Sequence, residues 1–184
     1  MTCFELVNQM VANCARAKLD PHQDNCKVTL TEPDCPDSEA TIFGVPQRAV
    51  VICLDKNFVL ERVFRGNHGE CKRCDFIIVA EKSNSIVIVY IEMKLTRDSK
   101  GDIEKQLYGA RCFVRYMQEL GKTFTNHKVF LDDAEHRFVS IKHTGSRKNK
   151  TKFDRSVEIH DTPETAPVIS WPHHVEFAQL AGGN

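Results

Sequence analysis

The chain has 184 residues, of which 41% are apolar, so it is long enough to bury a sizeable hydrophobic core in one globular domain. Its 25 Lys and Arg residues balance its 25 Asp and Glu residues, so the net charge gives no reason to infer a polyanionic partner or a membrane surface. Any affinity for nucleic acid must therefore come from local patches of charge.

The sequence contains no apolar run as long as the roughly 18 residues that a membrane helix needs, and its start lacks the pattern of a secretion signal. We therefore expect a cytoplasmic protein that does not enter a membrane. The cysteines are scattered, and several lie within apolar segments. In a cytoplasmic protein we expect them to be reduced thiols rather than parts of a disulfide framework.

The first part of the chain is predicted to contain one helix and two strands. Apolar residues recur at helical spacing over 3–18, which indicates an amphipathic helix. Prolines and acidic residues gather in 20–47, which is typical of a long connection. The segments 48–54 and 58–64 are then predicted to be strands joined by a tight turn, and a glycine-rich loop follows at 65–73.

The middle of the chain gives the strongest predictions of secondary structure. The segments 74–80 and 86–94 are rich in Ile, Val, Phe and Tyr, which strands prefer, and the short turn 81–85 between them predicts an antiparallel pair. Apolar residues form one stripe over 101–120, and Gly121 follows, which predicts a long amphipathic helix.

Further strands are predicted at 127–131, 136–142 and 166–171. A polar and basic segment, 144–152, shows no periodicity and is predicted to be a loop. The resulting order of helix, strands, helix and strand predicts an α/β fold in which a central mixed sheet is flanked by helices.

Three charged residues are predicted to meet at the ends of two neighbouring strands. Alternate side chains of a strand share a face, so Glu92 and Lys94 point to the same side. Asp75 lies at the start of the preceding strand, and antiparallel pairing places that start beside the end that carries the other two residues. Two carboxylates beside an amine suit Mg²⁺ or Mn²⁺, which prefer oxygen ligands and leave coordination positions to water and phosphate.

This pattern, Asp75 followed by Glu92-x-Lys94 on consecutive strands, resembles the PD-(D/E)XK nuclease superfamily, which includes restriction enzymes and Holliday-junction resolvases. The resemblance covers residues 1–131, where the predicted order of elements matches the αβββαβ core of that family. It implies a restriction-endonuclease-like core with a central mixed sheet. Cys74 stands where the written motif has proline, a substitution that the superfamily tolerates.

The resemblance implies a metal-dependent endonuclease that hydrolyses phosphodiester bonds in nucleic acid, more readily in DNA than in RNA. Asp75 and Glu92 would bind the metal, and Lys94 would assist the attacking water. Gln106, on the helix that follows the motif, corresponds to a glutamine that many members direct at the active site. Glu5, in the first helix, corresponds to an additional metal-site glutamate of some members, although an acidic residue there also favours the helix dipole.

The remainder of the chain, 132–184, would be a C-terminal extension of the same domain. Within it, 142–155 is strongly basic and suits contacts to phosphates that position a nucleic acid without reading its sequence. A solvated loop explains the same composition. Its basic residues are Lys142, Arg147, Lys148, Lys150, Lys152 and Arg155. Family members often form homodimers, but the sequence itself does not indicate one.

Two other readings of the sequence stay open. A nuclease-like module without activity could bind nucleic acid or a protein partner, and metal binding would separate it from an enzyme. A small zinc-stabilised module is the other alternative, because His68, Cys71 and Cys74 have ligand-like spacing. A structural zinc site needs four ligands and no second Cys-x-x-Cys exists, so we do not expect zinc.

Overall fold

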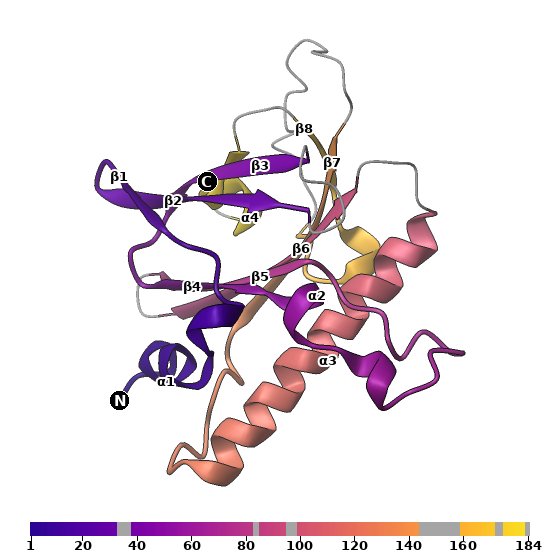
Figure 1. Cartoon of the computed structure of the whole chain (residues 1–184). Coiled ribbons are helices and arrows are strands. Elements are labelled where there is room, and N and C mark those ends of the chain that lie inside the picture. The colour runs from indigo at the N-terminus through magenta and orange to yellow at the C-terminus, as the bar shows by residue number, and fades with distance from the viewer. Residues whose placement is uncertain (33–37, 83–84, 95–98, 144–158, 172–174, 183–184) are drawn as a thin grey trace.

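The computed structural model describes residues 1–32, 38–82, 85–94, 99–143, 159–171 and 175–182. Within these ranges the chain is a mixed α/β protein with four α-helices and two mixed sheets, one of four strands and one of five (Figure 1). The helices are α1 (Cys3–Met10), α2 (Leu54–Asn57), α3 (Lys100–Phe124) and α4 (Phe177–Leu180). The strands are β1 (Asp20–His22), β2 (Asn25–Thr31), β3 (Glu39–Val45), β4 (Ala49–Cys53), β5 (Phe76–Lys82), β6 (Ser85–Lys94), β7 (Glu135–His143), β8 (Val168–Trp171) and β9 (Val175–Glu176).

The five-stranded sheet has the order β4-β5-β6-β7-β8. Its first three strands are antiparallel neighbours, whereas β7 and β8 run parallel to β6. Parallel neighbours need a crossover connection, and α3 lies within the connection from β6 to β7. This sheet confirms the predicted strands at 48–54, 74–80, 86–94, 136–142 and 166–171.

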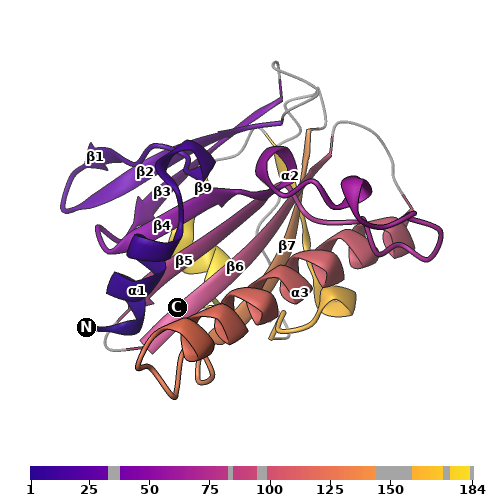
Figure 2. The same cartoon turned by 60° about the horizontal axis from the view of Figure 1, so that its bottom comes forward.

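Two hydrophobic cores cover the two faces of this sheet. One core joins it to the four-stranded sheet, whose order is β1-β2-β3-β9, and includes Ile42 and Val89. The other joins it to α1 and α3 and includes Tyr90 and Leu107. Figures 1 and 2 show α3 running along one face and β1–β3 lying over the other. Strands β5 and β6 are buried on both faces as a result, which explains their nearly continuous apolar sequences.

Helix α3 confirms the helix predicted at 101–120 and extends it at both ends. Ser99 caps its first turn by accepting a hydrogen bond from the Asp102 amide. Leu107, Ala110 and Val114 form its buried stripe against the sheet. No helix in the described part of the chain is long and apolar enough to cross a membrane.

The helix predicted at 3–18 is shorter in the structure, because α1 ends at Met10 and a 3-10 turn follows at Asn13–Ala15. The chain then runs beside the edge of β4, where the Ala17 amide donates a hydrogen bond of 2.9 Å to the Val51 carbonyl. Pairing with this strand edge competes with helix formation, so periodicity alone predicts too long a helix.

The connection predicted at 20–47 is wrong, because it contains strands β1, β2 and β3. Val28 and Leu30 are buried on one side of β2 while Thr29 between them is exposed, which is the alternation of a strand with one covered face. The prolines near this segment led to the prediction of a connection, although the alternation of buried and exposed residues indicates a strand.

Two predicted strands are absent from the structure. The segment 58–64 instead follows the one-turn helix α2 and contains a 3-10 turn at Leu60–Arg62. Its Phe58 packs against Phe113 of α3 with ring centroids 4.9 Å apart, so its apolar residues serve packing rather than strand pairing. The segment 127–131 is irregular, and the strand that follows α3 is β7, which lies beyond the expected core boundary at residue 131.

Candidate functional site

The structure brings Asp75, Glu92 and Lys94 to one end of the β5–β6 pair. Asp75 immediately precedes β5, and the next residue, Phe76, pairs with Ile91 of β6. The Asp75 carboxylate accepts a hydrogen bond of 2.7 Å from the backbone amide of Met93. Antiparallel pairing therefore places this carboxylate beside the last residues of β6, as the sequence predicts.

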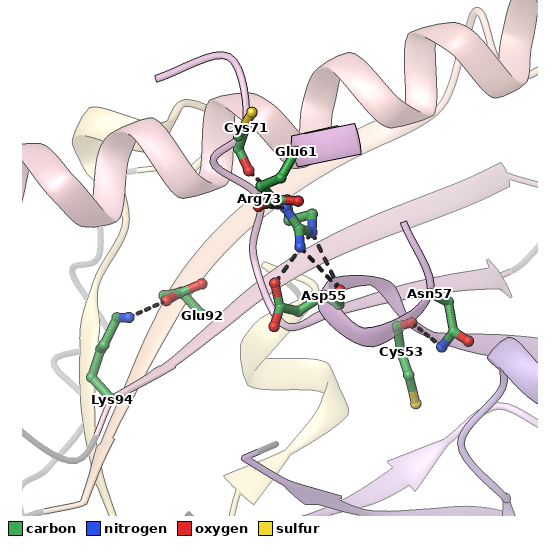
Figure 3. A network of polar contacts seen from close by, with 8 residues as sticks. All are labelled: Cys53, Asp55, Asn57, Glu61, Cys71, Arg73, Glu92 and Lys94. Carbon is green, nitrogen blue, oxygen red and sulfur yellow. Dashed lines mark hydrogen bonds and ion pairs between the residues drawn. The ribbon is translucent and has the colours of Figure 1, made fainter. Parts of the chain in front are cut away.

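Glu92 is the most buried member of this group. Its side chain is 0% exposed, and one of its carboxylate oxygens lies 2.8 Å from the Lys94 amine, which is 18% exposed (Figure 3). The Lys94 amine is thus the partner of this carboxylate in the described part of the chain. A fully buried carboxylate with a single lysine as its partner is uncommon and calls for an explanation.

Burial dominates the electrostatics of the two carboxylates. It raises the pKa of Asp75 to about 7, against the opposing effects of the Met93 amide and the Lys94 charge. It also raises the pKa of Glu92 well above its ordinary value, and the Asp75 charge adds to that rise while Lys94 opposes it. Two neighbouring carboxylates with raised pKa values are typical of functional sites, although structural networks also produce them.

Asp55 is a further acidic residue near this site that the sequence analysis did not identify. It lies on α2, and its negative charge contributes to the raised pKa of both Asp75 and Glu92. Arg73 holds it in place, because the guanidinium lies 3.2 Å from the Asp55 carboxylate and 2.8 Å from that of Glu61 (Figure 3). The sequence signal was an acidic residue directly after the apolar segment 48–54.

Gln106 lies on the second turn of α3, the helix that packs on the face of the sheet to which the Tyr90 side chain belongs. Because residues two apart in a strand share a face, Glu92 and Lys94 belong to this face as well. The side-chain amide oxygen of Gln106 (Oε1) is buried without a hydrogen bond. It is thus a buried acceptor without a donor on the same face of the sheet as Glu92.

Glu5 lies away from this group. It forms a capping box with Thr2 at the start of α1, and its nearest ion-pair partner is Arg48 at 3.9 Å. Arg48 also pairs with Glu81, which is near the end of β5 opposite to Asp75. The structure therefore gives Glu5 the helix-capping role and does not bring it together with the other candidate residues.

The basic residues predicted to contact nucleic acid fall mostly outside the described residues. This applies to Arg147, Lys148, Lys150, Lys152 and Arg155. Lys142 is described, and it lies on β7 as the direct neighbour of Lys94 in the parallel register. It therefore brings a second positive charge to the same end of the sheet.

The zinc alternative finds no support in the geometry. Within the described ranges, no group of three or more His, Cys, Asp and Glu residues is arranged to hold a metal ion. The Cys74 thiol is buried against the carbonyl of Phe76, and the Cys71 thiol contacts the carbonyl of Phe64. The seven described cysteines are free thiols.

A site for Mg²⁺ makes different demands, because this ion is usually bound through one or two carboxylates and keeps several waters. Asp75 and Glu92 provide two carboxylates at one place, and Lys94 is the cation paired with Glu92. The donor set therefore fits a hard divalent cation better than it fits zinc.

Comparisons of the chain with protein-family models, with curated proteins and with solved structures find no match. Any functional conclusion therefore depends on the geometry and chemistry of the site itself.

Proposed function

We propose that this chain is a metal-dependent nuclease of the PD-(D/E)XK type that hydrolyses phosphodiester bonds, with DNA as the preferred substrate. The observation that carries the proposal is the meeting of Asp75, Glu92 and Lys94 at one strand end, with the two carboxylates largely buried and Lys94 as the cation that pairs with Glu92. Burying two neighbouring carboxylates costs stability unless their charge is balanced. A bound cation would balance the buried negative charge of the two carboxylates.

The topology adds support to the proposal. The αβββαβ order that the resemblance implies can be traced through helix α1, strands β4, β5 and β6, helix α3 and strand β7, with β1–β3 inserted after α1 and α2 inserted after β4. The motif residues lie at the β5–β6 pair in the middle of this order, and β7 returns parallel to β6. Strands β1–β3, β8 and β9 are additions to that order.

The proposed roles follow from the positions of the side chains. Asp75 and Glu92 would hold Mg²⁺ or Mn²⁺, which supplies a charge that lowers the pKa of bound water and neutralises the phosphate. The Lys94 amine orients the attacking water and stabilises the charge that develops on the phosphate oxygens. The water oxygen bonds to phosphorus and gives up a proton to solvent, the bond between phosphorus and the leaving sugar oxygen breaks, and that oxygen takes up a proton from solvent. Gln106 supports this site from α3.

The test is a cleavage assay with Mg²⁺ or Mn²⁺ on plasmid DNA, single-stranded DNA, branched DNA and RNA, with a chelator control. The wild type should cut at least one substrate, and Lys94→Ala should lower the rate by at least about a hundredfold, as the loss of a transition-state donor does. Lys122→Ala is the matched control, because that lysine pairs with Asp132 near the far end of α3.

Cleavage that survives the chelator, or equal rates for wild type and Lys94→Ala, would remove this mechanism. Loss of activity in Lys122→Ala as well would indicate a general effect on folding rather than a role for Lys94 in the reaction.

A nuclease-like binding module without activity is the second candidate. The observation that favours it is the Lys94–Glu92 ion pair of 2.8 Å, which partly neutralises the carboxylate without a metal. Calorimetric titration of Mg²⁺ and Mn²⁺ separates the two candidates, because a binding module has no need of metal at Asp75 and Glu92. Metal binding that is lost in Glu92→Gln favours the enzyme.

A further inference from the structure

A cavity lies on α3, the helix that also carries Gln106. It is a cavity of about 480 Å³ between the outer face of α3 and the segment 58–70. Figures 1 and 2 show the chain between α2 and β5 lying beside this helix. A volume of this size is within the range of pockets that bind small organic groups.

Aromatic rings form much of the wall of this cavity. Phe64, Tyr108 and Tyr116 are 49%, 43% and 55% exposed, which is high for large aromatic side chains. Phe58 and Phe113 line it as well and stack edge to face. Exposed aromatic rings that gather around one cavity provide flat surfaces on which a planar group can stack.

The cavity is formed in advance by contacts that fix both of its walls. The Glu70 carboxylate accepts hydrogen bonds from the backbone amides of Gly66 and His68 at 2.9 and 2.7 Å, which holds the loop. A Cβ atom added at Gly109 of α3 would overlap the backbone carbonyl of Lys72, so the helix and the loop backbone are in direct contact there. A rigid pocket loses little entropy when it takes a ligand.

Positively charged side chains lie at this cavity, where a Cβ atom on Gly69 would be 3.7 Å from Lys105 and 3.9 Å from Lys72. Lys105 lines the cavity, Lys72 lies on the neighbouring loop, and both are exposed. Together with Lys94 they lower the pKa of Asp102 through their charges, after the larger effect of the Ser99 hydrogen bond. The three lysines therefore lie within electrostatic reach of one carboxylate at the start of α3. The backbone phosphates of a nucleic acid strand bound at Lys94 could therefore also contact Lys72 and Lys105.

We propose that this cavity binds an unpaired nucleobase of the nucleic acid strand whose backbone runs from the active site past Lys105. The inference rests on the proposed function for the identity of the strand. The rings supply stacking surfaces for a base, and the lysines supply contacts for its phosphates. An apolar peptide would use the rings but would leave the lysines unexplained. A base within a duplex is already stacked on both faces, so the cavity favours single-stranded or locally unpaired substrates.

The test measures binding without cleavage, in chelator, so its result does not depend on catalysis. The probes are single-stranded DNA and RNA oligonucleotides that contain one 2-aminopurine, and a DNA duplex of the same sequence. Stacking quenches the fluorescence of 2-aminopurine. The variants are Phe64→Ala and Tyr116→Ala, and the control is Phe124→Ala, which removes an aromatic ring that is 78% exposed and does not line the cavity.

The wild type and Phe124→Ala should bind a single strand more tightly than the duplex and quench the probe. Phe64→Ala and Tyr116→Ala should each weaken binding by roughly five- to hundredfold, the range expected for loss of one stacked base. Equal binding of single strand and duplex, no binding, or unchanged affinity in both cavity variants would overturn the inference. Cleavage in the separate assay with Mg²⁺ would then leave the proposed function standing.

Discussion

Replacing Asp75 by asparagine should stabilise the protein at alkaline pH, although the same change should impair metal binding. The hydrogen bond from the Met93 amide can be kept, because the asparagine side-chain oxygen is an equivalent acceptor. What the change removes is a negative charge that is largely buried and close to Glu92.

The size of the effect follows from the pKa of Asp75, which burial raises from 3.8 to about 7. Each tenfold change in proton affinity corresponds to about 1.4 kcal/mol, so ionised Asp75 costs on the order of 4 kcal/mol at pH 8. Asparagine avoids this cost, and we expect a gain of at least about 1 kcal/mol. For a chain of this size that raises Tm by about 3 °C or more.

The sign of the pH dependence is part of the same prediction. Because the folded pKa lies above the unfolded one, the folded state binds the Asp75 proton more tightly, and the stability it contributes is fully present below pH 3.8. That stability is lost as the pH rises through about 7. The advantage of Asp75→Asn over the wild type should therefore be largest at pH 8 and shrink steadily toward pH 4.

Thermal unfolding followed by circular dichroism from pH 4 to pH 8, in chelator, measures the difference. Asp102→Asn is the matched control, because the Ser99 hydroxyl lowers the pKa of that exposed carboxyl and its loss should not stabilise the protein. An unchanged or lower Tm of Asp75→Asn at pH 8 would refute the view that Asp75 is a strained, buried charge. Added Mg²⁺ should raise the Tm of the wild type more than that of Asp75→Asn.

Three other predictions test separate parts of the structure. Calorimetric affinity for Mg²⁺ should weaken as the pH falls below about 7, since Asp75 must lose its proton to bind the ion; pH-independent affinity would contradict this. Burial lowers the pKa of His136 to about 4, so stability should fall as the pH drops from 6.5 to 4, and His136→Gln should reduce that acid sensitivity in denaturant titrations. Gly109→Ala should destabilise the fold by about 2 kcal/mol or more through overlap with the loop backbone. Gly101→Ala, with open space around it, should be neutral or stabilising by up to about 1 kcal/mol in the same titrations.

The parts of the fold that could be predicted from sequence are those with a long and uniform signal. The strands at 76–82 and 85–94 are apolar throughout because layers cover both of their faces, and α3 repeats its apolar stripe over several turns. Their pairing fixed the meeting of Asp75 with Glu92 and Lys94, so the centre of the site followed from strand geometry alone.

The missed parts depend on tertiary contacts that local patterns do not contain. The segment 58–64 has the composition of a strand, but Phe58 packs on α3, and the segment pairs with none of the strands in the described ranges. Asp55 could not be placed from sequence, since its position is set by a one-turn helix and by the buried guanidinium of Arg73. The N-terminal helix was overextended because Ala17 pairs with β4.

The charge balance of the site supports the proposal that it binds a cation. Asp75 and Glu92 together carry two negative charges when ionised, whereas Lys94 provides one positive charge in direct contact. Burial disfavours the ionised form of both carboxylates, so the pair tends to retain a proton, and this is why both pKa values are raised. A divalent cation would displace that proton and supply the charge that Lys94 alone does not. Lys94 would then be released from neutralising Glu92 and could act on a phosphate, so the same charge imbalance would favour binding of both the proposed metal and its substrate.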